Sequence, residues 1–221
     1  MRYALKRLGG SVLSDDEKIT VIAEKFTGIL KALGLDPDSP SLKETPKRVA
    51  TMYVKEIFVG LKKEAFPKLT FSDFTKPTRS SSTVVVKNIQ LVSHCEHHFV
   101  PMVGVAHIAY LPKDKVIGLS KLNRIAKYFA SRPQLQERLT CQIAESLAHI
   151  LQTPDVAVFT EMSHFCVQGR GVLDKESTTR AHFLLGRFES DPSFRQEFLW
   201  FFPEASMKKN YGETSQNSRL A

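Results

Sequence analysis

The order of strand-like and helix-like segments after residue 82 most constrains what this chain can fold into. Runs of β-branched and aromatic residues are typical of strands, and apolar residues at helical spacing are typical of helices. In chain order the segments are strand-like 83–92 and 103–110, helix-like 119–130 and 134–151, and strand-like 155–167 and 178–188. This ββααββ order predicts an α+β fold in which a sheet is covered on one side by two helices.

Two further helices are expected ahead of this unit. Residues 14–34 begin with a capping box, in which Ser14 and Glu17 stand three residues apart, and continue with apolar residues at helical spacing. A second helix is expected to begin with Thr45 as its N-cap, just before a proline, and to end near Gly60. Together these helices predict an N-terminal helical subdomain.

Domain boundaries follow from these segments and from local composition. We expect an N-terminal helical subdomain (1–62), a connector that contains prolines and a serine run (63–82), the α+β domain (83–203) and a polar tail (204–221). A short helix over about residues 191–201 closes the α+β domain. The polar tail is expected to be disordered.

The composition is that of an ordinary globular protein, with 42% hydrophobic and 24% charged residues. No apolar run approaches the roughly 18 residues that a membrane-spanning helix needs, so no membrane partner is expected. The first residues lack the apolar core of a signal peptide. Three cysteines are an odd number and too few for a disulfide scaffold, which favours a cytoplasmic protein.

The net charge of +8 predicts an anionic partner, either nucleic acid or a phosphorylated small molecule. Seven basic residues stand against two acidic ones between Lys113 and Arg138. The chain has no lysine or arginine run and no basic low-complexity tail. A solvated basic helix face would give the same local pattern.

A potential metal site is divided between two segments far apart in the sequence. Cys95 and His98 form a C-x-x-H pair just after a strand-like segment, and Cys166 lies in another such segment. Two thiolates and an imidazole suit Zn²⁺, and three protein ligands leave a fourth position for water. Cys141, in the middle of a predicted helix, is expected to be a buried thiol without a metal.

The neighbours of these ligands have different expected roles. Side chains alternate along a strand, so His164 should face the same cavity as Cys166 and serve there as a proton carrier. Adjacent residues rarely bind one ion, which separates the role of His97 from that of His98. Glu96 is expected to orient the metal ligands.

The remaining histidines are expected to have no role in the site. His94 is interpreted as a solvated strand residue, and His107, His149 and His182 as structural or surface histidines.

Five stretches of the sequence match one known family in the right order. They read CEHH (95–98), GLSKLNR (118–124), QERLT (136–140), HFCVQGRG (164–171) and, outside the site, ETPKRVATMYVKEIF (44–58). From about residue 14 to residue 202 the chain thus resembles the type I GTP cyclohydrolases. The resemblance implies the tunnelling fold, whose four antiparallel strands join those of neighbouring subunits, and a homodecamer built from two stacked pentamers with active sites between subunits.

The resemblance also implies an activity and a cofactor. Enzymes of this family convert GTP and water to 7,8-dihydroneopterin triphosphate and formate, the first step of tetrahydrofolate and pterin biosynthesis. One Zn²⁺ per subunit, bound by Cys95, His98 and Cys166, is implied to lower the pKa of the water that attacks C8 of the guanine.

Proton transfer and substrate binding are assigned by the same resemblance. His97 is implied as the proton donor when the imidazole ring of the base opens, and His164 and Ser120 serve the ribose rearrangement. Glu137 is implied to accept from N1–H and N2–H₂ of guanine, which adenine does not present together. The other implied substrate-binding residues are Gln136, which helps to hold the base, and Lys121, Arg124, Arg170 and Arg48, which bind the triphosphate.

Two alternatives lead to different expectations. Queuosine-precursor nitrile reductases share the fold but use a nucleophilic cysteine and a nicotinamide, and they lack this zinc set. A basic nucleic-acid-binding protein with a structural zinc would need a fourth protein ligand, and no residue is suitably spaced for it. Gln168 departs from the family pattern without removing a ligand. The sequence leaves open whether Fe²⁺ replaces Zn²⁺ and whether a regulator acts.

Overall fold

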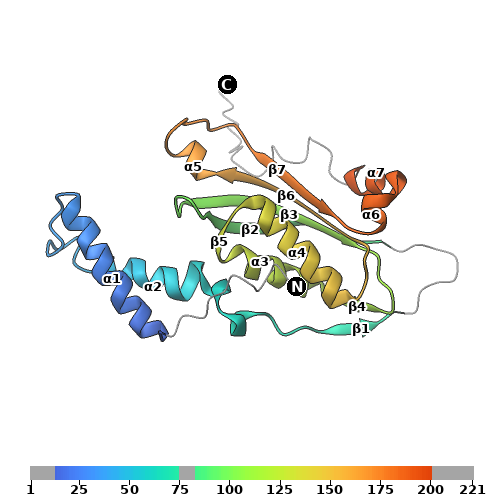
Figure 1. The fold of residues 1–221 in the computed structure, drawn as a ribbon, viewed down its shortest axis with the longest axis horizontal. Helices are drawn as coiled ribbons and strands as arrows, with labels where there is room; N and C mark the ends of the chain where they lie inside the picture. The colour runs from blue at the N-terminus through green and yellow to red at the C-terminus, as the bar shows by residue number, and fades with distance from the viewer. Residues whose placement is uncertain (1–12, 75–82, 201–221) are drawn as a thin grey trace, which may run out of the picture.

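A five-stranded sheet forms the centre of the molecule in a computed structural model that describes residues 13–74 and 83–200 (Figure 1). Four long strands pair antiparallel in the order β2-β3-β6-β7, and a short β5 pairs parallel with the end of β2. Their bounds are β2 Val84–Cys95, β3 Pro101–Tyr110, β5 Pro133–Gln134, β6 Val156–His164 and β7 Thr179–Leu184. The predicted α+β fold with an antiparallel sheet is confirmed, and β5 is an addition that the sequence pattern did not predict.

Helices α3 (Leu119–Ala130) and α4 (Gln136–Leu151) cover one face of this sheet, as predicted (Figure 1). Their apolar sides pack with alternate strand residues, such as Ile108 and Val158, in one large core that is nearly closed to solvent. Because side chains alternate along a strand, the intervening residues lie on the other face. There, a smaller apolar cluster joins Ala109 of β3 to the C-terminal helices.

The C-terminal helices are α6 (Arg187–Ser190) and α7 (Pro192–Trp200). The bounds of α7 agree with the short helix predicted over about residues 191–201. Phe188 of α6 and Phe198 of α7 are buried against strand residues that face away from α3 and α4. One end of the second sheet face is therefore also covered by helices, which the ββααββ pattern alone did not indicate.

The N-terminal helix α1 (Asp15–Ala32) has the predicted start. The Ser14 hydroxyl accepts from the backbone N–H of Glu17, whose carboxylate accepts from the backbone N–H of Ser14, so both halves of the capping box are present. In α2 (Thr45–Met52) the prediction was wrong by one residue. The carbonyl of Glu44 accepts the first helical bond, from the N–H of Arg48, so Glu44 is the N-cap and Thr45 is the first helical residue.

The second helix continues with a change of hydrogen-bond pattern. A π-helical turn, η1 (Tyr53–Ile57), and a 3₁₀ turn, η2 (Val59–Leu61), carry the chain to the predicted end near Gly60. A Cβ on Gly60 would lie only 2.1 Å from the carbonyl oxygen of Tyr128. The Gly60 N–H donates to Ser131 O, and Gly60 O accepts from Nε of Arg132. This close approach joins the N-terminal helices to the end of α3.

The first part of the expected connector is ordered against the α+β unit. It contains η3 (Lys63–Ala65) and β1 (Phe71–Asp73), and β1 pairs antiparallel with β4 (Lys115–Ile117). The rest of the connector from residue 75 to 82 and the polar tail lie outside the described residues. The division into domains stays a prediction. Within 13–74 and 83–200, no helix is long and apolar enough to cross a membrane.

Candidate functional site

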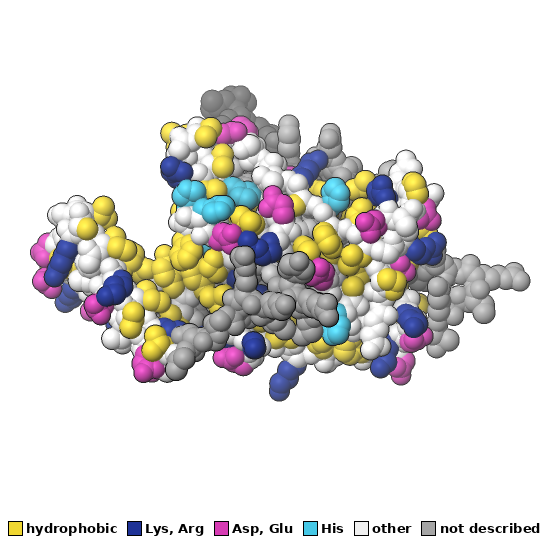
Figure 2. All heavy atoms as spheres, in the orientation of Figure 1, with side chains coloured by type: hydrophobic (Ala, Val, Ile, Leu, Met, Phe, Trp, Pro, Cys, Tyr) yellow, Lys and Arg dark blue, Asp and Glu magenta, His cyan; other side chains and the backbone are white. Residues whose placement is uncertain are grey.

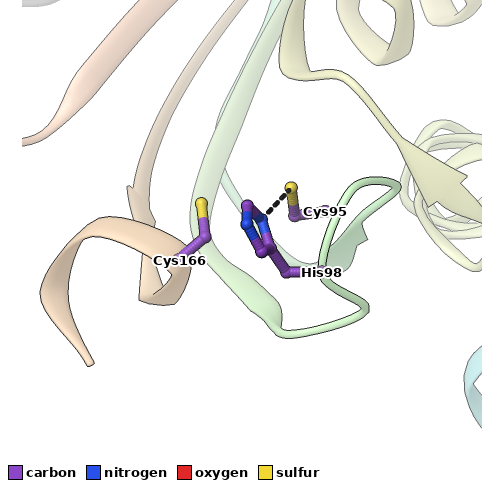
Figure 3. Close-up of side chains that lie close together, drawn as sticks. All are labelled: Cys95, His98 and Cys166. Carbon is purple, nitrogen blue, oxygen red and sulfur yellow. Dashed lines mark hydrogen bonds between the residues drawn. The ribbon is translucent and has the colours of Figure 1, made fainter. Parts of the chain in front are cut away.

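Cys95, His98 and Cys166 lie together at one end of the sheet (Figure 3). Cys95 is the last residue of β2 and is buried, and His98 stands exposed in the turn that leads to β3. Cys166 comes from α5 (Phe165–Gln168), the short helix that follows β6. The structure therefore brings the two distant segments together, with all three side chains pointing toward one another.

The geometry of this group fits a metal ion. One ligand atom from each residue lies within 4.8 Å of the other two, and Cys95 Sγ is 3.9 Å from His98 Nδ1. A tetrahedral zinc ion separates a sulfur ligand from a nitrogen ligand by about 3.5–3.6 Å, since its bonds are about 2.3 and 2.0–2.1 Å long. Burial and the neighbouring Cys95 thiol raise the pKa of Cys166, and a bound cation would relieve this by favouring the thiolates.

The strand argument that placed His164 and Cys166 on one face was wrong. The last pair of the β3–β6 ladder joins Met102 to His164, and β3 begins one residue earlier, at Pro101. Beyond His164 the chain has no further strand partner on β3, and it turns into α5, where Phe165 O accepts from the N–H of Gly169. Cys166 reaches the metal group from a helical turn and not from a strand.

His97 lies beside this group without completing it. Its Nδ1 is 3.8 Å from Cys95 Sγ, about as near as that of His98, but the group with Cys166 contains His98 and not His97. The two imidazole rings are 6.3 Å apart and nearly perpendicular. His97 is exposed, which leaves it open to a bound substrate. Figure 2 shows histidine side chains gathered on this side of the molecule, with acidic and basic side chains beside them.

Gln136 fixes the imidazole of His164. Its side-chain nitrogen donates to the backbone oxygens of Thr160, at 3.2 Å, and Thr179, at 2.9 Å. Carbonyl oxygens only accept, so this end of the amide is nitrogen and the end that faces His164 is oxygen. His164 Nε2, at 2.7 Å, must therefore donate to Gln136 Oε1. The proton that His164 can gain or lose is the one on Nδ1.

The environment of His164 favours its neutral form. Burial lowers the pKa of His164, and the nearby carboxylate of Glu137 opposes this shift. A neutral imidazole with its Nε2 proton held by Gln136 has a free lone pair on Nδ1. His164 is thus arranged as a proton acceptor.

The remaining predicted residues lie on four parts of the fold. Glu137, in the first turn of α4, and Arg170, after α5, are exposed, and Arg170 Nη1 is 3.4 Å from His98 Nε2. Ser120, Lys121 and Arg124 lie on α3, and Arg48 lies on α2. Gly118 is the N-cap of α3, so Ser120 is the second residue of the helix. Gln136, in contrast, is buried, with its amide engaged by His164 and two threonines.

Sequence reasoning missed Arg138. Its guanidinium donates to both carboxylate oxygens of Glu96, at 2.6 and 2.9 Å. The two residues are 42 positions apart, and no local pattern pairs them. Glu96 was expected to orient the metal ligands, and Arg138 is the residue that holds its carboxylate.

The interpretation of His94 as a solvated residue was wrong. Its side chain is buried near the end of β2, and its ring packs edge-on against Phe58, with centroids 5.5 Å apart. The N-terminal helices supply this cover, which a strand pattern cannot reveal. His107 is buried, whereas His149 and His182 are exposed, as expected for structural and surface histidines. Cys141 is only partly buried.

The group offers three protein ligands among the described residues, whereas a structural zinc site in a nucleic-acid-binding protein would close with a fourth.

The curated proteins to which this chain is similar in the following comparisons all belong to one family. A family model described as GTP cyclohydrolase I matches residues 22–202. Curated relatives named GTP cyclohydrolase 1 include those of Buchnera aphidicola subsp. Schizaphis graminum, 47% identical over 188 residues, and Aeromonas salmonicida, 47% over 192 residues. These alignments cover 85% and 87%, respectively, of both chains. The relative of the same name from Vibrio cholerae is 49% identical over 83% of both chains.

Proposed function

The chain belongs to the GTP cyclohydrolase I family, and on that premise we propose that it converts GTP and water to 7,8-dihydroneopterin triphosphate and formate. This is the first step of tetrahydrofolate and pterin biosynthesis. The observation that carries the proposal is the convergence of Cys95, His98 and Cys166, with His164, two residues before Cys166, held by Gln136 in a defined tautomer. The two motifs that supply these residues lie within the matched range.

One Zn²⁺ per subunit is the proposed cofactor. Two thiolates and one imidazole are a donor set that zinc prefers, although Fe²⁺ is a second candidate. When bound, zinc supplies a water of lowered pKa as the nucleophile for C8 of the guanine. The chain contributes Cys95, His98 and Cys166 as ligands, and the partly open surface beside exposed His98 leaves access for substrate.

Three residues are proposed to move protons. His97, exposed beside Cys95, donates a proton as the imidazole ring of the base opens. His164 accepts and returns a proton at Nδ1 while the ribose opens and rearranges, because Gln136 holds Nε2. Ser120 assists the same rearrangement with its exposed hydroxyl.

Recognition of the base is proposed to depend on Glu137. An ionised carboxylate accepts two hydrogen bonds, and guanine presents N1–H and N2–H₂ side by side. Adenine presents an acceptor at N1, so ATP would set a lone pair against the carboxylate. Gln136 was expected to hold the base as well, but its engaged amide supports a different role. We propose that it contributes by orienting His164.

The triphosphate is proposed to bind four basic side chains. Arg170 stands next to His98, and the other three are Lys121 and Arg124 on α3 and Arg48 on α2. The net charge of +8 suits a substrate with several phosphates. Nucleic acid and membranes are not proposed as partners.

We propose that the active protein is a homodecamer of two stacked pentamers in the cytoplasm, with active sites between subunits. In the described part of the chain, β7 pairs with β6 alone, which leaves an edge to which a neighbouring strand can add. The exposed apolar side chains of Phe165, Val172 and Leu173, near the metal group in sequence, support burial by another subunit.

The function is tested by incubating the purified, zinc-loaded protein with GTP. The products are oxidised, pterin fluorescence is measured, and formate is quantified in the same sample. We expect equal amounts of pterin and formate with GTP, and no product with ATP or after metal removal by a chelator. A zinc-loaded oligomer that releases neither product would refute the proposal.

A further inference from the structure

We propose that the Glu96–Arg138 ion pair is a positioning device that fixes the metal-binding turn against helix α4. The inference rests on the proposed function, because it concerns the metal site used there. Cys95 ends β2, and the turn from there to β3 carries the second proposed ligand, His98, and the proton donor His97. Its position therefore decides the geometry of both the metal and the reacting base.

The turn is held by backbone hydrogen bonds and by the ring of Phe99, which packs against Phe58 with centroids 5.2 Å apart. Cys95 and Val100 are joined by a backbone hydrogen bond at its base, and the N–H of Phe99 donates to Cys95 O. Phe99 adopts a left-handed backbone conformation, with φ at 55°, which non-glycine residues rarely adopt. His97 and His98 are exposed. Backbone hydrogen bonds therefore close the turn and also join it to β5, which precedes α4.

The carboxylate of Glu96 adds a side-chain connection from this turn to α4. Both of its carboxylate oxygens accept from Arg138, at 2.6 and 2.9 Å, and its backbone N–H donates to Gln134 O at 3.0 Å. A two-bond contact between planar groups fixes orientation as well as distance. About 30% of each side chain is exposed, so the charge attraction alone is weak, and the value of the pair lies in its geometry.

Three successive residues at the start of α4 then each hold a different part of the proposed active site. Gln136 holds His164, Glu137 is the proposed contact of the guanine, and Arg138 holds the metal-binding turn. The first turn of α4 thereby sets the position of the base relative to both proton carriers. Loss of the ion pair should loosen the metal ligands and misalign His97, without removing any ligand.

The experiment measures zinc affinity and turnover separately in Arg138→Gln, Glu96→Gln, Arg138→Lys and the double Gln variant. Zinc affinity is measured by competition with a chromophoric chelator, without GTP, and Co²⁺ spectra report the ligand geometry. We expect about tenfold or greater weakening of zinc binding in each single variant, as is typical when groups that orient metal ligands are lost. Arg138→Lys should not rescue it, because lysine cannot form the two-bond contact.

The double variant adds an internal check. If both residues act through one contact, it should bind zinc no more weakly than the worse single variant. The matched control is Arg180→Gln, which breaks the Glu161–Arg180 ion pair on β6 and β7, with a closest contact of 2.8 Å. We expect it to leave zinc affinity and the Co²⁺ spectrum unchanged.

Zinc affinity within twofold of the parent in both Gln variants overturns the proposal, as does full rescue by Arg138→Lys. If Arg138→Gln fails to fold, Glu96→Gln and Arg138→Lys still decide the question. Failure of the parent protein to release formate from GTP would refute the proposed function instead. That outcome is distinguishable, because the zinc measurements need no substrate.

Discussion

His164 and Cys166 stand only two residues apart, yet they belong to different elements and have different proposed roles. His164 ends β6, where Gln136 holds its ring, and Cys166 lies in α5, where it faces Cys95 and His98. Because the chain changes from strand to helix between them, strand alternation does not relate the directions of the two side chains.

Because the two residues have different proposed roles, substituting each should affect zinc binding and turnover differently. Cys166→Ala should abolish both zinc binding and turnover, because two remaining ligands hold the ion poorly. His164→Ala should keep zinc within about threefold and reduce turnover by about 10²–10⁴-fold, the range of proton-transfer catalysis. Metal analysis of the purified variants and formate release measure the two effects. A His164→Ala protein without metal would contradict this division of roles.

The helices and strands were largely predictable because their signals are local. The capping box of α1 and the periodicity of α3 depend on residues three or four positions apart, and the structure has both. The two-residue strand β5 and the turn into α5 were not predictable in this way, since each is decided by which strand lies alongside.

In the candidate site, too, the features set by local sequence were predictable, and the contacts between distant segments were not. The ligand residues could be proposed from residue type and spacing, and the structure places them together. The contacts that hold the neighbouring residues Glu96 and His164 could not be predicted, because Arg138 is 42 residues from Glu96 and Gln136 is 28 residues from His164. Such contacts exist only once α4 has packed on the sheet.

The close contact between η2 and the end of α3 gives a prediction about the stability of the protein. Gly60→Ala should destabilise the protein by about 1–3 kcal/mol, the usual cost of overpacking, because its Cβ would meet two backbone carbonyls. Urea denaturation of both proteins measures the difference. Gly28→Ala, in α1 with no neighbouring atom within 4 Å of its Cβ, should be neutral or stabilising. An equal decrease in the free energy of unfolding of both variants would show that the close approach at Gly60 does not contribute to the cost of the substitution.

The stability of the whole molecule should depend on pH through His107. This side chain is buried on β3, where its Nδ1 accepts from the backbone N–H of Asn88, and its ring lies against Phe159. Burial, together with nearby Lys87, lowers the pKa of His107 to about 4. The unfolded chain, with an ordinary pKa of about 6.5, then binds the proton more readily than the folded chain.

The direction in which stability changes with pH follows from this difference in the pKa of His107. The contribution of His107 is fully present above about pH 6.5 and is lost as pH falls toward 4, by up to about 3 kcal/mol. Urea denaturation at pH 7.5 and pH 4.5 tests this with His107→Gln, which cannot titrate but keeps an acceptor for Asn88. The variant should lose less stability on acidification than the parent. An identical loss in both proteins would exclude His107 as the cause.

The proposed decamer concerns the whole molecule. In that assembly, the edge of β7 that is unpaired among the described residues and the exposed Val172 and Leu173 would lie against other subunits. The number of subunits was expected from the family resemblance, since composition and periodicity do not encode it.

The division of the metal site between a hairpin turn and a distant helix also affects the order of events in folding. Cys95 and His98 need only their own turn to come together, whereas Cys166 can join them only when β6 lies beside β3. Forming that long-range pairing is a slow, entropically costly step, and an ion held by two ligands does little to speed it. Zinc should therefore act mainly after the folding barrier, so that it slows unfolding and leaves the rate of folding almost unchanged.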